Sequence, residues 1–183
     1  LEALVSEMRL SSLLVDHALS TYRIALQYGL TKGKKANHIA AACLYIACRA
    51  KATPHMLLDF SVVLKTDVFV LGHCFMKLRE RLNLPIPIAE PFFYIRRFCS
   101  QLEFGDKYID VVNTTNKLVS AMKRDWMQTG RRPAGLCAAA ILIAARLHGF
   151  RRTQDEVVRV ARICGATLSR RLREFEQTPT ASM

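Results

Sequence analysis

The sequence predicts an all-α protein built from two tandem helical bundles, and three observations carry that prediction. Apolar residues recur at steps of three and four, as at Ala18, Tyr22 and Ala25. The strict alternation typical of strands is scarce. The chain also repeats itself at a constant offset, which pairs Gly33 with Gly130. With 183 residues and 51% hydrophobic composition, each copy has enough apolar material for its own core.

The repeat is clearest in two basic, glycine-led stretches that each run into a small, apolar helix. They read GKKANHIAAACLYIACR at residues 33–49 and GRRPAGLCAAAILIAAR at residues 130–146. These helices are apolar on nearly every side, and their alanines let neighbouring helices approach closely. Each stretch therefore predicts the buried central helix of a five-helix bundle.

Turn and breaker residues divide each copy into about four or five helices. The expected breaks are at residues 29–33, 53–54, 65–67, 105–106, 129–133, 149–153 and 165. Between the copies lies NLPIPIAEP, residues 83–91, whose prolines cannot continue a helix and favour an extended connection. We therefore expect a first repeat at 1–83, a proline-rich linker at 84–91, a second repeat at 92–178 and a tail at 179–183.

The end of the second copy predicts a helix-turn-helix. Thr153 is placed to cap a helix, with Glu156 three residues later closing a capping box. We expect this helix to run to Cys164, Gly165 to form the turn, and the next helix to cover residues 167–175 with its apolar stripe inward. A second helix of this kind can enter the major groove of DNA. It would present Thr167, Ser169, Arg170, Arg171 and Arg173.

The net charge of +12 and pI near 9.8 favour an anionic partner, with nucleic acid ahead of acidic protein or membrane. Paired basic residues precede both central helices: Lys32, Lys34 and Lys35 in the first copy, and Arg131 and Arg132 in the second. Cations oppose the dipole at a helix N-terminus, so an anion nearby is favoured, and free amides plus cations form a phosphate clamp. The alternative is a solvated charged loop.

Further basic residues surround the helix-turn-helix. Arg151 and Arg152 directly precede it and are candidate phosphate ligands. Arg159 and Arg162 either join them or are solvated on the outer face. Trp126, the only tryptophan, follows a long helical stretch, and we interpret it as a core residue rather than a base-stacking one.

Enzymatic and metal chemistry find little support in the sequence. The six cysteines are scattered and resemble core hydrophobes of a reducing compartment, so no zinc site is expected. There is no glycine-rich phosphate loop, no nucleophile with a recognisable base, and no carboxylate pair beyond Asp155 and Glu156, which suit a helix N-terminus. No apolar run is long enough for a membrane span, so we expect no membrane partner. The sequence has no Met start and no charged-then-apolar leader at Leu1, so we expect it to be part of a longer protein.

Longer strings carry a family resemblance. They are AACLYIACRAKATPHMLLDFS at residues 41–61, MKRDWMQTGRRPAGLCAAAILIAARLHGFRRT at 122–153 and LREFEQTP at 172–179. The tandem bundles resemble the cyclin-fold repeats of the TFIIB family, and these strings resemble its branch serving RNA polymerase III, the TFIIB-related factor Brf. The resemblance implies a nuclear, non-catalytic transcription initiation factor, a TFIIIB subunit. Such a factor binds promoter DNA with TATA-binding protein, recruits RNA polymerase III and works with other TFIIIB and TFIIIC subunits.

The resemblance also implies that this part of the protein carries no cofactor, since the family's zinc ribbon lies outside it. In TFIIB the last helix reads bases with an arginine that aligns with Ser169 here, so we expect backbone contacts and weak sequence specificity. The matching helix of the first copy, with Gly72, His73, Cys74 and Met76, is less cationic and suits a protein-facing surface.

Two alternative functions remain open. One is a TFIIB-type factor of RNA polymerase II. The other is a kinase-regulating cyclin, since MRLSSLLVDHAL at residues 8–19 resembles the opening of a cyclin box. His17 stands where that motif has tryptophan, and a cyclin has no need of paired basic residues in both copies.

Overall fold

The computed structural model describes residues 2–127 and 129–182. Within these residues the chain has ten α-helices and two short 3-10 helices, and no strand is found there. The predicted all-α class is confirmed.

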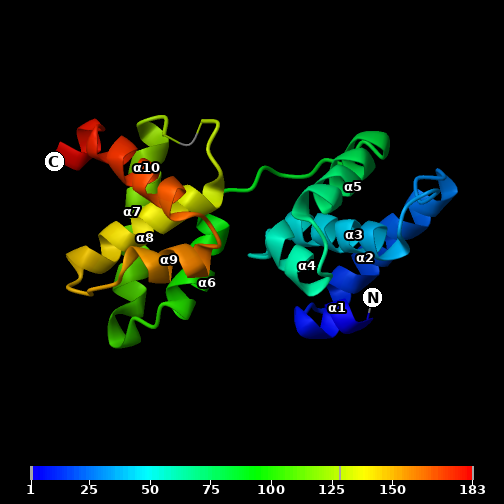
Figure 1. The fold of residues 1–183 in the computed structure, drawn as a ribbon, viewed down its shortest axis with the longest axis horizontal. Coiled ribbons are helices and arrows are strands. Elements are labelled where there is room, and N and C mark those ends of the chain that lie inside the picture. The colour runs from blue at the N-terminus through cyan, green and yellow to red at the C-terminus, as the bar shows by residue number, and fades with distance from the viewer. Residues whose placement is uncertain (1, 128, 183) are drawn as a thin grey trace. The chain divides into compact units, whose positions relative to one another are not determined.

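The chain divides into two compact units, Leu1–Ile88 and Ala89–Met183. Each unit is a bundle of five α-helices, as the repeat predicts (Figure 1). The first unit holds α1 (Glu2–Glu7), α2 (Ser12–Gln27), α3 (Ala36–Ala50), α4 (Leu57–Val63) and α5 (Val68–Arg81). The second unit holds α6 (Phe92–Gln101), η1 (Gly105–Lys107), α7 (Tyr108–Arg124), α8 (Pro133–Leu147), α9 (Gln154–Ala161), α10 (Gly165–Glu176) and η2 (Pro179–Ser182).

Helix α3 is the centre of the first unit and packs against α2, α4 and α5. All its residues from Ile39 to Cys48 are buried, because alanine and cysteine side chains are small enough for helices to approach on every side. Tyr45 makes edge-to-face contacts with Phe60 at 6.0 Å and Phe75 at 5.1 Å between ring centroids. Phe60 is fully buried, which stabilises the unit by about 2 kcal/mol.

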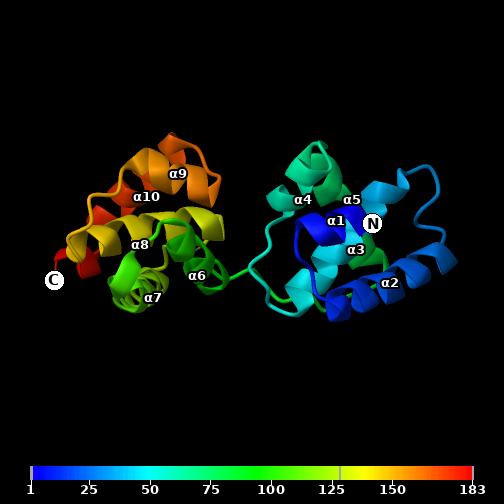
Figure 2. The ribbon, with the colours of Figure 1, turned by 90° about the horizontal axis from the view of Figure 1, so that it is seen from below.

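Helix α8 is the corresponding centre of the second unit and packs against α6, α7, α9 and α10 (Figure 2). Pro133 occupies its first turn, where a missing N–H costs nothing, and Gly135 to Leu142 are buried without interruption. Both predicted central helices are confirmed.

The first residues of the linker still pack against the first unit. Leu84 and Ile86 pack against the core of that unit, and Arg49 of α3 donates a hydrogen bond to the Pro87 carbonyl. The second unit begins with a half-buried Ala89, and Pro91 forms the N-cap of α6.

The helix-turn-helix is confirmed, but its boundaries differ from the prediction. Thr153 caps α9: its hydroxyl accepts from the Glu156 N–H at 3.2 Å, and the Glu156 carboxylate accepts from the Thr153 N–H at 2.7 Å. The helix ends at Ala161 rather than Cys164, because Arg162 turns left-handed with φ 52°. Gly165 is therefore the first residue of α10, and the expected turn at Gly165 is wrong.

Candidate nucleic-acid interface

The two central helices begin in the same way. Gly33 and Gly130 both have φ 71°, a left-handed conformation that glycine adopts without steric cost, and a lysine or arginine follows as N-cap. Lys35 caps α3 and Arg132 caps α8, neither helix has a side-chain cap bond, and neither has an acidic residue in its first turn. Both N-termini therefore present the positive end of the dipole beside exposed cations. At α8, Pro133 has no N–H and the Gly135 N–H donates to the Arg132 carbonyl at 3.1 Å, which leaves the Ala134 N–H at the opening of the helix.

Three arginines share one carboxylate beside the start of α8. The Glu174 oxygens lie 3.3 Å from Arg131 Nε, 3.4 Å from Arg170 Nε and 2.9 Å from Arg171 Nη1. Since three guanidinium groups face one carboxylate, these four side chains keep two positive charges in excess, and Arg132 adds a third. Arg132 is exposed next to Arg131. We call Arg131, Arg132, Arg170, Arg171 and Glu174 the arginine cluster.

Arg171 is the fixed member of the arginine cluster, with only 7% of its surface exposed. Burial lowers the pKa of its guanidinium, an effect that Glu174 opposes. Its place follows from Gly135 on α8: a Cβ there would lie 3.4 Å from the Thr167 methyl and 3.6 Å from Arg171 Cγ, so glycine leaves the room that both side chains occupy. The prediction that Arg171 is presented outward is wrong, because this helix face packs on α8.

The outward face of α10 carries fewer of the expected residues than the sequence indicates. Arg170 and Arg173 are exposed. Thr167 is half-buried with its hydroxyl 2.9 Å from Cys164 Sγ, and the Ser169 hydroxyl donates to Gln154 Oε1 at 3.4 Å. Arg170 and Arg173 are thus the cations that this helix offers to a ligand.

The two arginines before α9 have different surroundings. Arg152 is half-buried: it donates to the Glu103 carbonyl at 2.8 Å, pairs with Glu156 at 3.5 Å and lies 5.7 Å from the centre of the Phe104 ring. Arg151 is exposed and lines a shallow hollow together with Arg146. Arg151 is therefore available to an anion, while Arg152 mainly holds the loop in place.

In the first unit, the lysines before α3 repeat this pattern with less charge. Lys32 and Lys35 are exposed, and Lys34 is half-buried with its Nζ 3.8 Å from Cys74 Sγ on α5. By the repeat, Lys34 and Cys74 correspond to Arg131 and Arg171 of the second unit. The same helix contact is therefore present, but without the cationic cluster.

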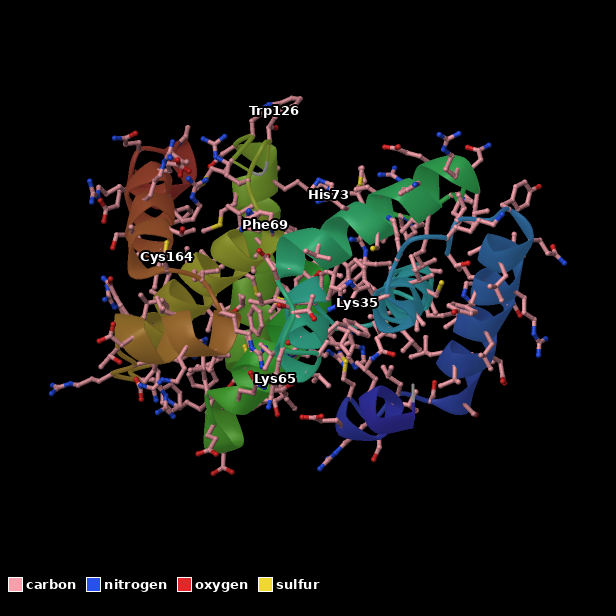
Figure 3. All side chains as sticks on the ribbon, turned by 45° about the vertical axis from the view of Figure 1, so that its right-hand side comes forward. Lys35, Lys65, Phe69, His73, Trp126 and Cys164 are labelled. Atoms are coloured by element: carbon pink, nitrogen blue, oxygen red, sulfur yellow. The ribbon has the colours of Figure 1, made fainter. Side chains whose placement is uncertain are left out.

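The outer face of α5 exposes apolar side chains and a histidine where α10 carries arginine. Phe69 is 66% exposed and Met76 43% exposed, and the exposed His73 contacts the Phe69 carbonyl through Nδ1 at 2.8 Å (Figure 3). By the repeat, His73 and Met76 correspond to Arg170 and Arg173. The corresponding helices α5 and α10 thus differ in the chemistry that they expose.

Trp126 departs from the sequence prediction. Its side chain is 80% exposed and points away from the end of α7 (Figure 3). The core position belongs to the next residue, Met127, which is 6% exposed. The prediction that Trp126 is a core residue is wrong, because the helix ends in a turn that directs it outward.

Cysteines and metal ligands form no second site in the part of the chain that the structure describes. No group of three or more His, Cys, Asp or Glu residues there could hold a metal ion. Burial raises the pKa of Cys43 and of Cys99 to about 12, as expected of core thiols. Cys164 is exposed, and hydrogen bonding to Thr167 lowers its pKa. Among the described helices, none has the length and apolar character to span a membrane.

Comparison with known proteins identifies the bundles. The family model for the transcription factor TFIIB repeat matches residues 1–81, which contain α1 to α5, and residues 86–178, which contain α6 to α10. The chain belongs to the TFIIB family. Its two five-helix TFIIB repeats therefore have the tandem cyclin fold that the sequence predicts.

Individual relatives refine this assignment. The TFIIB repeats are 48% identical to the human transcription factor IIIB 90 kDa subunit over 97% of this chain and 26% of the human protein. They are 42% identical to the Schizosaccharomyces pombe transcription factor IIIB 60 kDa subunit over all of this chain and 37% of that protein. Identity to the Pyrobaculum islandicum transcription initiation factor IIB is 35%, over 97% of this chain and 53% of that protein. The predicted resemblance to TFIIIB subunits is confirmed, and the chain spans about a quarter to a half of these relatives.

Proposed function

We propose that this chain is the core of a TFIIIB-type transcription initiation factor. It binds promoter DNA together with TATA-binding protein and recruits RNA polymerase III in the nucleus, without a catalytic role. Similarity to proteins named as transcription factor IIIB subunits supports the polymerase assignment over that of TFIIB itself. The observation that carries DNA binding is the arginine cluster, whose excess charge lies beside the uncapped N-terminus of α8.

The mechanism is electrostatic. Phosphates of the DNA backbone bind Arg131 and Arg132 together with the Ala134 amide at the opening of α8, while Arg170 and Arg173 of α10 reach neighbouring phosphates along the groove. Because Ser169 turns toward Gln154 and no arginine occupies its place, α10 reads few bases and specificity is weak. Arg151 extends the basic surface beside α9.

The first TFIIB repeat binds both DNA and protein, through different surfaces. Lys32 and Lys35 give α3 a weaker phosphate site of the same design. The outer face of α5, with the apolar side chains of Phe69 and Met76 exposed, binds a protein of the initiation complex, such as TATA-binding protein or the polymerase. TFIIIC and the other TFIIIB subunits are partners of the assembled factor.

The test is a gel shift on TATA-containing promoter DNA with TATA-binding protein present, across a salt series. Wild type is compared with Arg131→Glu/Arg132→Glu and with Lys107→Glu/Lys117→Glu, which changes the net charge equally at exposed positions outside the arginine cluster. We expect wild type and the lysine variant to form a supershifted complex that weakens with salt, and the arginine variant to lose it.

Two results bear on the proposal separately. If the wild-type chain never joins TATA-binding protein on DNA, or if both double variants behave alike, the arginine cluster is not the DNA site. Transcription assays with the chain restored to its full-length protein decide the polymerase: support of RNA polymerase II rather than RNA polymerase III would contradict the assignment.

A further inference from the structure

Trp126 is the largest exposed apolar side chain of the second repeat and the only tryptophan of the protein. A tryptophan buries about 150–250 Å² when it packs, yet this one is left 80% exposed. Its own bundle therefore gains little from it. Figure 3 shows the indole standing clear of the ribbon at the end of α7.

The backbone at Trp126 suits a different residue. After α7 the Met127 N–H donates to the Met122 carbonyl at 3.0 Å and φ of Trp126 is 58°, the geometry of a left-handed helix end. In the first repeat the same end of α2 has Gly29 with φ 65°, and the Leu30 N–H donates to the Ala25 carbonyl at 2.9 Å. Glycine adopts this conformation freely, whereas a bulky side chain is strained there.

Hydrogen bonds to main-chain carbonyls connect Trp126 to Arg131 of the arginine cluster, and exposed arginines flank it in sequence. The Trp126 carbonyl accepts from the Thr129 N–H at 3.3 Å, and the Thr129 carbonyl accepts from Arg131 Nη1 at 2.7 Å. Arg124 and Arg132 are exposed on either side in sequence. The exposed indole thus shares one hydrogen-bonded turn with an arginine assigned to the phosphate backbone.

We propose that Trp126 is a DNA-contact residue, whose indole packs against the deoxyribose and base edges of the duplex that the arginine cluster holds. This rests on the proposed function and adds an apolar contact to its electrostatic ones. Duplex DNA is the occupant that the charge favours, since it offers phosphates for Arg131 and Arg132 and apolar sugar and base surface within reach of the same turn.

The tryptophan provides its own assay, because its fluorescence reports this one position. The chain is titrated at low salt with a fluorescently labelled promoter duplex, and anisotropy of the label, indole emission and quenching by acrylamide are measured on matched samples. We expect binding to change the indole emission and to protect it from acrylamide. Binding with an indole as accessible as in the free protein overturns the proposal and leaves the proposed function intact, whereas absence of binding overturns both.

Variants separate the apolar contact from the charged ones. Trp126→Gly places the residue of the first repeat at the same backbone position, so the variant folds; thermal unfolding verifies this. We expect it to weaken DNA binding roughly five- to ten-fold with an unchanged slope of log affinity against log salt, and Trp126→Phe to recover part of the loss. The matched control is Ile109→Ala, which removes a 66% exposed side chain at the other end of α7.

Two further results would overturn the proposal. One is unchanged affinity in Trp126→Gly. The other is an indole that stays accessible to acrylamide on DNA and becomes protected only when a partner protein is added. In that experiment the emission of the added protein is subtracted by repeating the addition with Trp126→Phe, which has no indole of its own. That result would assign Trp126 to a protein partner instead.

Discussion

Replacing Glu174 by glutamine should tighten DNA binding while weakening the second TFIIB repeat. Glu174 holds Arg131 and Arg170 at 3.3 and 3.4 Å from its oxygens, so in the free protein it occupies cations that the phosphate backbone requires. A phosphate bound to the far side of either guanidinium lies about 7 Å from the carboxylate. At that distance the repulsion is about 0.6 kcal/mol in water and about 2.4 kcal/mol at an effective dielectric constant of 20.

Salt reduces this repulsion. With a screening length of about 8 Å at physiological ionic strength, about 0.3–1 kcal/mol remains, which corresponds to roughly two- to five-fold tighter binding of Glu174→Gln. The same substitution lowers the stability of the fold, because Arg171 is 7% exposed and loses its charged partner. Since Glu174 itself is partly solvated, we expect a loss of about 1–3 kcal/mol in the free energy of unfolding.

The assay is anisotropy of a labelled promoter duplex with TATA-binding protein held constant, together with urea unfolding of the free chain. Glu176→Gln is the matched control, because it removes the same charge from an exposed position on the same helix. We expect Glu176→Gln to change the affinity less than Glu174→Gln does. Weaker DNA binding by folded Glu174→Gln would refute the reasoning, since Glu174 would then aim the arginines at DNA rather than compete for them.

Three further predictions concern the second repeat. Hydrogen bonds from Thr153 lower the pKa of Glu156 below its ordinary 4.5. The contribution of Glu156 to stability is therefore complete above pH 4.5 and is lost as the pH falls through the lowered pKa. The melting temperature of Glu156→Gln should then approach that of wild type in acid, and a difference that stays constant with pH would contradict this. Cys164, with its lowered pKa, should be the first thiol of the native protein to react with an alkylating reagent, at pH values below 9.0, and a fast phase that survives in Cys164→Ser would contradict this. Gly135→Val should lower the free energy of unfolding by about 1–3 kcal/mol in urea, because its Cβ lies 3.4 Å from the Thr167 methyl; unchanged stability would show that α10 yields freely.

Much of the fold is predictable from local signals in the sequence. The small-residue helices specify their own burial, because few side chains on α3 or α8 could face water, and Thr153 with Glu156 specifies the start of α9. The end of α9 is different. Arg162 adopts a left-handed conformation that its residue type does not predict. Gly165, the residue most typical of a turn, belongs to the next helix.

The candidate site is predictable in its exposed cations and not in its interior. Arg131, Arg132 and Arg170 are exposed as expected, whereas the burial of Arg171 depends on the space left by a glycine of another helix. A signal was present: Glu174 follows Arg170 and Arg171 at helical spacing, which indicates ion pairing along α10.

The exposure of Trp126 was also predictable from the sequence repeat. The repeat aligns it with Gly29, and a glycine at the end of a helix indicates a left-handed turn that carries the side chain outward. Internal repeats therefore inform about backbone conformation as well as about core positions, because one copy can show what conformation the other must adopt.

The most direct test of the account is the salt dependence of DNA binding by the charged helix ends. The slope of log affinity against log salt is measured with TATA-binding protein constant for wild type, Lys32→Ala/Lys35→Ala, Arg131→Ala/Arg132→Ala and the control Lys107→Ala/Lys117→Ala. If the residues before α3 and α8 bind phosphates, each of the first two double variants makes the slope shallower by up to about 1.8, with the larger change in the arginine variant, and the control leaves the slope unchanged. Slopes equal to wild type in both clamp variants would contradict the assignment of DNA binding to these helix ends.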